Sequence, residues 1–328
     1  MQEISDKRFV ITGGSGLIGT RVAQTLLERG AAHVTLLDNL SLSALTHLDD
    51  LISDDRVTFV QADILDRESL TEAFDGADGV FAIAAFLVIP MSRDVRLGLN
   101  VNINGMMNVI EAARAASVGK VVFASSISVY GAAIDGLVSE SSPFSSTDIS
   151  PTFALYALSK LIGEQLGALY AASGGPEFST VRFATVYGER QHERGLNALQ
   201  IVKAYKAIQM GERPVIVGSG DDGHDFIYVG DAAEGMVRTM EVGRTGAAYN
   251  IATGRSLTTR EAVEAVIRIT GTDLRPRFVP DERGAAAPTL RESLHLDVSA
   301  AKTDLDWEAA VGIEEGIGMM ISWLDRVE

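Results

Sequence analysis

Tyr156 and Lys160 stand four residues apart in Leu155–Leu161 and are the pair in this chain best suited to acid/base chemistry. On a helix, residues four apart lie on one face, so the phenol and the ammonium can point into the same pocket. A phenol with its ordinary pKa of about 10 is a poor base at neutral pH, but a fixed positive charge nearby lowers that value. The spacing therefore indicates an acid/base pair, although a packed ring beside a solvated amine has the same spacing.

The chain around this pair alternates short apolar runs with helix-sized segments. A helix is expected over Leu17–Glu28, and strands are expected over Phe9–Ile11, His33–Asp38, Val57–Val60, Val80–Ala84 and Lys120–Ala124. Strands that alternate with helices form parallel sheets whose two faces are both covered. The sequence therefore predicts an α/β fold, a doubly wound parallel sheet with a second, smaller mixed α/β domain.

A glycine-rich turn separates the first expected strand from the first expected helix and contains Gly13, Gly16 and Gly19. Glycine permits positive φ and lets backbone amides approach a pyrophosphate at the start of a helix. Asp38 ends the second strand, where a carboxylate can accept hydrogen bonds from a ribose diol and repels a 2′-phosphate. No arginine flanks Asp38, so the pattern predicts NAD rather than NADP. The alternative is a structural turn followed by a helix-capping aspartate.

The Gly-x-x-Gly-x-x-Gly spacing resembles the short-chain dehydrogenase/reductase superfamily, and the length of 328 residues resembles its extended branch. Other segments similar to that family are Ala62–Ile64, Ala84–Ala85, Asn102–Val109 and Phe123–Gly131. The resemblance implies a catalytic set of Ser126, Tyr156 and Lys160. It also implies an NAD site formed by Gly13, Gly16, Leu17, Ile18, Gly19, Asp38, Asn39, Asp63, Ile64, Ala84, Ala85, Asn102, Tyr156, Lys160 and Phe183.

The roles implied for the catalytic set divide the chemistry among three side chains. Ser126 would hydrogen-bond the substrate oxygen, and Tyr156 would take or give its proton. Lys160 would lower the tyrosine pKa and bind the nicotinamide ribose, and the positive ring of NAD⁺ would lower that pKa further.

The second half of the chain contains the segments Val181–Gln191, Val215–Gly220, His224–Asp231 and Tyr249–Gly254, which resemble those of sugar-nucleotide epimerases and dehydratases. Two residues depart from that family. Thr185 stands where relatives usually have Asn, and His224 where they usually have Arg, the natural bidentate partner of phosphate. Arg190, Arg194 and Arg291 are then candidate phosphate contacts. The expected substrate contacts are Ser126, Ser128, Thr185, Arg190, His224 and Arg291.

The reaction type is narrowed by the residues that follow Ser126. Sugar-nucleotide dehydratases of this family carry an Asp-Glu pair there and the related decarboxylases a Glu, whereas this chain has Ile127-Ser128. Without a carboxylate to act as acid or base, dehydration and decarboxylation are disfavoured. The resemblance favours an NAD-dependent epimerase whose small-molecule substrate is a sugar, of the nucleotide-linked kind that its relatives use. The alternatives are an NAD-dependent dehydrogenase or reductase of a non-nucleotide alcohol or ketone, and a non-catalytic NAD-sensing protein.

The segment Phe86–Met91 is more apolar than the polar pocket loop that such enzymes commonly carry. It has two interpretations: packing under a loop, or a pocket wall suited to a less polar substrate.

Composition excludes several other classes. A net charge of -16, from 44 acidic and 28 basic residues, argues against a nucleic-acid partner. The chain has no cysteine, and its five histidines show no metal-ligand spacing, so no metal site is expected. The start lacks a signal-peptide pattern, and the longest apolar run, Val80–Met91, is 12 residues, too short for a bilayer. No membrane partner and a cytoplasmic location are expected.

The domain organisation follows from the same resemblance. We expect an NAD-binding Rossmann domain over residues 1–184, with segments at about 225–252 returning to it, and a discontinuous substrate domain over 185–328. The substrate should bind between the two domains, over the carboxyl ends of the strands. The resemblance also implies a homodimer whose interface is formed by the helices that hold Asn102 and Tyr156.

Overall fold

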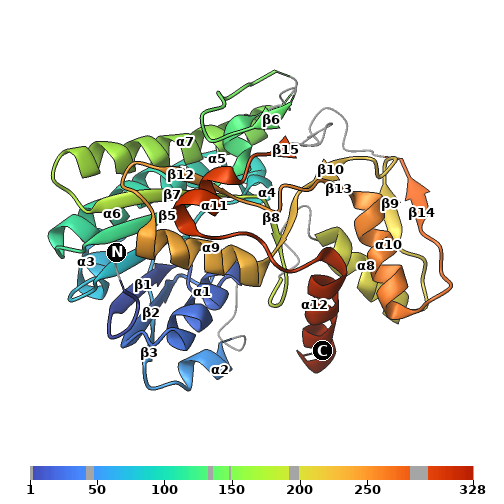
Figure 1. Ribbon diagram of the computed structural model, residues 1–328, viewed down its shortest axis with the longest axis horizontal. Helices are drawn as coiled ribbons and strands as arrows, with labels where there is room; N and C mark the ends of the chain where they lie inside the picture. Colours follow the sequence, from blue (N-terminus) through green and yellow to red (C-terminus); the bar gives the residue numbers. More distant parts are fainter. Residues whose placement is uncertain are drawn as a thin grey trace.

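The computed structural model describes residues 3–41, 48–131, 136–147, 149–191, 199–280 and 295–327. Its central feature is a sheet of seven parallel strands in the order β12, β7, β5, β4, β1, β2, β3 (Figure 1). The strands are β1 (Arg8–Thr12), β2 (His33–Asp38), β3 (Val57–Gln61), β4 (Gly79–Ala82), β5 (Lys120–Ser126), β7 (Glu177–Phe183) and β12 (Ala248–Ile251). The predicted doubly wound α/β fold is confirmed, and the strand order reverses between β1 and β4.

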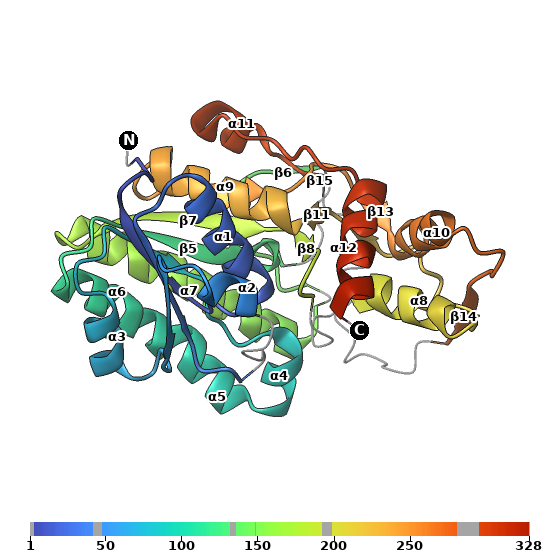
Figure 2. The ribbon, with the colours of Figure 1, turned by 90° about the horizontal axis from the view of Figure 1, so that it is seen from below.

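Helices cover both faces of this sheet, as Figure 2 shows. One face carries α1 (Leu17–Glu28), α9 (Val229–Val242) and α11 (Ser299–Leu305), and the other carries α3 (Arg67–Ala73), α6 (Met106–Ala115) and α7 (Pro151–Ala172). Successive strand residues point to opposite faces. In β5, Val122 therefore packs in the core under α1 and α9, while Val121 and Phe123 pack in the core under α3 and α6. Burial on both faces explains why these strands are continuous apolar runs.

A second, smaller region is built around its own hydrophobic core, which contains Tyr187, Ile216, Val263 and Met320. Its helices are α8 (Leu199–Gln209), α10 (Thr259–Thr270) and α12 (Ile313–Val327). Its strands form two-stranded pairs: β8 (Thr185–Tyr187) with β11 (Phe226–Tyr228), β9 (Val215–Val217) with β14 (Arg277–Val279), and β10 (Gly223–His224) with β13 (Leu257–Thr258). This smaller α/β region was expected from the sequence and is confirmed.

Parts of the second half of the chain return to the large sheet. β12 pairs with the edge strand β7, and α9 packs beside α1. Ala301 and Leu305 of α11 are fully buried in the same core, a return that the sequence did not predict. The predicted domain boundary near residue 184 stays a prediction.

The remaining described elements are short. They are α2 (Asp49–Ile52), α4 (Val88–Arg93), α5 (Val95–Leu99), a π-helical turn (Asn100–Gly105), a 3₁₀ turn (Ile127–Tyr130), and the paired strands β6 (Leu137–Val138) and β15 (His295–Leu296). Within the described part of the chain, every helix is too short or too polar to cross a bilayer. The cytoplasmic location stays a prediction.

Candidate active site

Two glycines at the junction of β1 and α1, Gly13 and Gly19, leave no room for a side chain. Gly13 has φ +72°, and a Cβ on it would lie 2.8 Å from the backbone nitrogen of Ala84. A Cβ on Gly19 would lie 2.3 Å from the carbonyl oxygen of Gly13. Gly16 caps α1 without a side-chain hydrogen bond, so the first amides of the helix are not covered by a capping side chain. Such a turn at a strand-order reversal fits a pyrophosphate.

The ends of β2 and β3 carry the polar groups suited to a ribose. One carboxylate oxygen of Asp38 accepts from the backbone N–H of Ser15 at 3.2 Å, and the other accepts from Leu40 at 2.8 Å. The amide of Asn39 donates to Asp63 at 2.9 Å. All three predicted polar residues, Asp38, Asn39 and Asp63, line the same cleft. A negative group fixed here accepts hydrogen bonds from a diol and disfavours a phosphate in its place.

Asn102 lies behind the wall of the cleft and does not line it. Its Oδ1 accepts from the backbone N–H of Phe86 at 2.7 Å, and its Nδ2 donates to the Phe86 carbonyl at 3.0 Å and to Ser159 Oγ at 3.0 Å. Its amide therefore ties the segment after β4 to α7. Direct contact between Asn102 and a cofactor stays a prediction.

The catalytic candidates meet at the carboxyl end of β5. Ser150 caps α7 by accepting from Phe153 N, and Pro151 follows at the start of the helix, so α7 presents Tyr156 and Lys160 toward the strand. Tyr156 hydrogen-bonds Ser126. Lys160 Nζ donates to the carbonyl of Ala124 at 2.8 Å and lies 6.0 Å from the centre of the Tyr156 ring. The three side chains that the sequence selected are therefore brought together in one place.

Burial governs the ionisation of both groups on α7. It raises the pKa of Tyr156 to about 12, and the hydrogen bond from Ser126 offsets only part of that rise. Burial also lowers the pKa of Lys160 to about 8, against the charge of Glu164, which raises it. In the chain by itself, desolvation of the phenol is the largest effect on the Tyr156 pKa, and the expectation that Lys160 lowers that pKa stays a prediction. The chain alone keeps Tyr156 as a proton donor.

The cleft has a volume of about 400 Å³ and lies over the carboxyl ends of the central strands. Of the predicted cofactor residues, all except Gly19 and Asn102 line it. Its apolar wall includes Phe86, Leu87, Leu97, Val101 and Val186. Phe86 and Leu87, the first residues of the segment after β4, thus form part of the cleft wall, whereas Met91 is fully buried. That this wall suits a less polar substrate stays a prediction.

The predicted substrate residues of the second region lie outside this lining. The backbone N–H of Thr185 donates to the carbonyl of Asp225 at 2.8 Å, within the pairing of β8 and β11. His224 is buried, and its Nε2 lies 2.8 Å from a carboxylate oxygen of Asp222. Ser128 is buried, and its hydroxyl has no hydrogen-bond partner among the described residues. Their substrate roles stay predictions.

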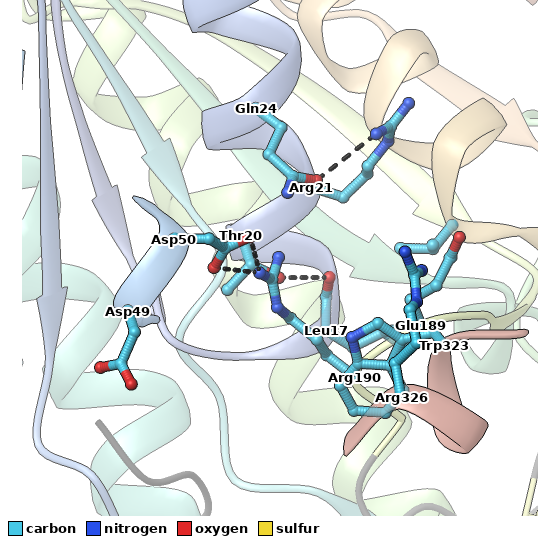
Figure 3. Close-up of a pocket in the computed structure, with 11 residues that line it drawn as sticks. Leu17, Thr20, Arg21, Gln24, Asp49, Asp50, Glu189, Arg190, Trp323 and Arg326 are labelled. Atoms are coloured by element: carbon cyan, nitrogen blue, oxygen red, sulfur yellow. Dashed lines mark hydrogen bonds and ion pairs between the residues drawn. The ribbon is translucent and has the colours of Figure 1, made fainter. Parts of the chain in front are cut away.

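Arg190 points into a different cavity, one of about 440 Å³ between α1, α2 and α12. Figure 3 shows its guanidinium directed at Asp50. Arg190 Nη2 donates to both carboxylate oxygens of Asp50, each at 2.6 Å. This pair joins the loop after β8 to α2. Arg194 and Arg291, the other candidate phosphate contacts, lie outside the described residues.

Sequence reasoning missed two polar groups near the cleft. Gln191 lines it, and its buried side-chain oxygen has no hydrogen-bond partner among the described residues. Ser125 also lines it and donates to Glu164 at 2.6 Å. The four-residue spacing from Lys160 to Glu164 was a usable signal for the second of these.

A glycine turn at the strand-order reversal, with Ser, Tyr and Lys gathered beside it, defines an extended short-chain dehydrogenase/reductase. The model of the NAD dependent epimerase/dehydratase family matches residues 9–252. The chain belongs to this family, whose cofactor is NAD.

Individual relatives agree with this assignment. The UDP-glucose 4-epimerase of Mycolicibacterium smegmatis is 32% identical over 320 residues, which cover 96% of this chain and 98% of that protein. The structure of the UDP-N-acetylglucosamine 4-epimerase from Methanobrevibacter ruminantium M1 matches with a TM-score of 0.88 and 27% identity, covering 99% of this chain and 100% of that one. The UDP-glucose 4-epimerase of Thermus thermophilus, in complex with NAD, matches with a TM-score of 0.83 and 28% identity, covering 98% and 100%.

Proposed function

We propose that this protein is an NAD-dependent epimerase of a nucleotide-linked sugar, which oxidises a hydroxyl transiently and then returns the hydride to the other face. The observation that carries the choice is the position of the carboxylates. Of the described residues that line the cleft, the acidic ones are Asp38 and Asp63, at the ends of β2 and β3. Elimination of water or loss of CO₂ is served by an acid or base beside the reacting carbon.

The distance across the sheet keeps those carboxylates away from the reaction. Strand β2 lies three places from β5 in the sheet. With neighbouring strands about 4.8 Å apart, the end of β2 is about 14 Å from the end of β5. This separation supports a cofactor role for Asp38 and leaves Ser126 and Tyr156 to handle a hydroxyl by proton transfer alone.

The chain's own groups would perform the proton steps. NAD supplies the hydride acceptor and donor, as in other nicotinamide enzymes. Ser126 orients the substrate oxygen, and Tyr156 takes the hydroxyl proton as the carbon is oxidised and gives it back when the ketone is reduced. Because burial raises the pKa of Tyr156 to about 12 in the chain alone, it takes that proton only when positive charge is close, from Lys160 and from the oxidised cofactor.

We propose a nucleotide-linked substrate because of the chain's similarity to nucleotide-sugar epimerases. The relatives described above act, by their names, on UDP-glucose or UDP-N-acetylglucosamine. Thr185 is engaged through its backbone N–H and His224 is buried beside Asp222, so the diphosphate contacts of this chain are left unassigned. The competing function, a dehydrogenase or reductase of a non-nucleotide alcohol or ketone, is favoured by the apolar wall at Phe86 and Leu87.

A substrate screen separates the two functions. Purified protein is assayed with UDP-, dTDP-, GDP- and CDP-sugars, plain sugars and hydroxy acids, while NADH absorbance and product epimers are followed together. The epimerase is expected to convert a nucleotide sugar without net NADH formation. Stoichiometric consumption of added NAD with a simple alcohol would establish the dehydrogenase instead, and no hydride exchange with any compound would favour an NAD sensor.

We also propose that the protein is a homodimer through α7. Leu158, Ile162 and Leu169 of this helix are 41%, 41% and 61% exposed, and their spacing places them on one side of it. Two α7 helices packed by this apolar side would cover all three residues. Light scattering is expected to give twice the chain mass for the wild type and a monomer for Ile162→Glu. The control is Met210→Glu, an exposed position of the smaller region, which should stay a dimer.

A further inference from the structure

Glu164 stands one turn after Lys160 on α7 and takes part in a buried ion pair. It is 8% exposed, and its carboxylate accepts from Arg182 Nε at 3.0 Å and from Nη2 at 2.7 Å. The hydroxyl of Ser125 donates to the same carboxylate at 2.6 Å. This carboxylate thus accepts three charge-assisted or short hydrogen bonds, all of them in the interior.

Strand β5, which carries Ser125, also carries the catalytic candidate Ser126 and contacts the helix that carries Tyr156 and Lys160. The carbonyl of Ala124 accepts from Lys160, the side chain of Ser125 donates to Glu164, and Ser126 hydrogen-bonds Tyr156. Three successive residues of β5 are therefore matched to three successive turns of α7. A shift of the helix along the strand would break all three contacts together.

We propose that Glu164 is a positioning residue for Lys160, which fixes α7 on β5 and holds the lysine ammonium charged beside Tyr156. This inference rests on the proposed function only for its catalytic consequence. Its physical content concerns the charge and position of Lys160, which are measurable without a substrate.

The charges around Lys160 support this assignment. Burial lowers the pKa of Lys160 to about 8, and the negative charge of Glu164 is what opposes it. Arg182 of β7 is bonded to the Glu164 carboxylate and is not among the groups that shift the Lys160 pKa. Tyr130 of the 3₁₀ turn bonds Arg182 rather than Lys160. Without Glu164, an amine buried to this degree loses its proton closer to neutral pH.

Other ionisable groups packed on α7 lie elsewhere along it. Glu111 of α6 accepts from the hydroxyl of Tyr170, near the far end of the helix. It is a carboxylate against the same helix, but it does not contact the turn that holds Lys160. It therefore supplies a matched control for the loss of one negative charge.

The test is a direct titration of Lys160 in the full-length protein. The chain has six lysines, so the side-chain NMR signals of labelled lysine can be resolved, and that of Lys160 is assigned from the Lys160→Met variant. In Glu164→Gln the Lys160 pKa is expected to fall by about one pH unit from its wild-type value. In Glu111→Gln it is expected to stay unchanged. An unchanged Lys160 pKa in Glu164→Gln overturns the inference.

A second variant covers the case in which Glu164→Gln does not fold, because it leaves the Arg182 charge buried alone. Glu164→Gln combined with Arg182→Met removes both charges, and neutral replacements of a buried pair are generally tolerated. The Lys160 pKa is expected to remain below wild type, since the carboxylate whose charge raises it is lost. A wild-type value in the double variant would again contradict the role of Glu164.

The catalytic consequence is read separately from the pH profile of turnover. A lower Lys160 pKa moves the alkaline limit of kcat to lower pH by the same amount, whereas a purely structural defect lowers kcat at every pH. If wild-type protein turns over none of the sugars, the proposed function fails while the lysine titration still decides this inference. A kcat loss with no movement of the alkaline limit would reduce Glu164 to a structural residue.

Discussion

The two ends of strand β5 each lie beside a buried lysine, and the two lysines have different surroundings. Burial lowers the pKa of both Lys120 and Lys160 to about 8. At the start of the strand, Lys120 Nζ donates to the carbonyls of Thr239 at 2.8 Å and Gly243 at 2.6 Å, at the C-terminal end of α9. At the other end, Lys160 lines the cleft beside Tyr156.

A pKa lowered by burial, which the two lysines share, does not by itself mark a functional site. Lys120 satisfies the last carbonyls of a helix, a structural use of a cation that the helix dipole favours. Lys160 stands at the carboxyl ends of parallel strands, where α/β proteins bind their ligands. Position in the sheet separates the two lysines, and the following predictions test that separation.

The largest effect is expected at the cleft end, from Tyr156→Phe. The substitution removes the hydroxyl that transfers the proton and keeps the ring, so turnover should fall by about a thousandfold. NAD affinity should remain nearly unchanged, because the glycine turn and Asp38 are untouched. Turnover is measured with the substrate found in the screen, and NAD binding by calorimetry. A variant with near wild-type turnover would remove Tyr156 from the mechanism.

The next effect is expected from Gly19→Ala in the glycine turn. The new Cβ would lie 2.3 Å from the carbonyl oxygen of Gly13, so the turn must move. Overpacking of this kind costs about 1–3 kcal/mol, which corresponds to a loss of NAD affinity of about 5- to 150-fold if the strain falls on the cofactor site. The control is Gly318→Ala in α12, where a Cβ meets nothing within 4 Å. Equal NAD affinity in both variants would show that this turn does not bind the cofactor.

At the opposite end of β5, Lys120→Met should affect stability and not catalysis. It removes two hydrogen bonds to buried carbonyls, which we expect to lower the free energy of unfolding by about 2 kcal/mol. The control is Lys7→Met. The ion pair of Lys7 with Asp78 is partly exposed, so its loss should lower the free energy of unfolding by less than about 1 kcal/mol. Denaturant unfolding measures both. If Lys120→Met reduced kcat while the protein remained fully folded, Lys120 would also affect catalysis, and the two ends of β5 would not differ in role.

Most of the cofactor end could be predicted from the sequence because its signals are local. The glycine spacing, Asp38 at a strand end and the pair Tyr156 and Lys160 each depend on residues close together in the chain. The alternation of strands and helices then places them at one edge of the sheet. All of these residues except Gly19 do line the cleft.

The substrate end could not be predicted in the same way because its side chains are engaged by remote residues. Arg190 pairs with Asp50, which is 140 residues away, and no local pattern reports such a contact. Thr185 is engaged through its backbone by Asp225, and α11 joins the main core from the end of the chain. Spacing identifies which residues are suited to a phosphate, but tertiary packing decides where they point.

The smallest effect is a pH dependence of stability that isolates Lys120. Its pKa is about 8 in the folded protein and returns to its ordinary value of 10.5 on unfolding. Between these values the unfolded chain binds more protons, so the contribution of Lys120 to stability rises as pH increases. The Lys120→Met variant lacks this rise. The free energy of unfolding of the wild type minus that of the variant should therefore increase by about 1 kcal/mol between about pH 8 and about pH 9. Subtracting the variant cancels the titration of Lys160 and the tyrosines, which are common to both proteins. If the difference is flat or falls with pH, the charge on the buried amine of Lys120 does not destabilise the folded protein. Of the two lysines, only Lys160 would then have a pKa lowered by burial.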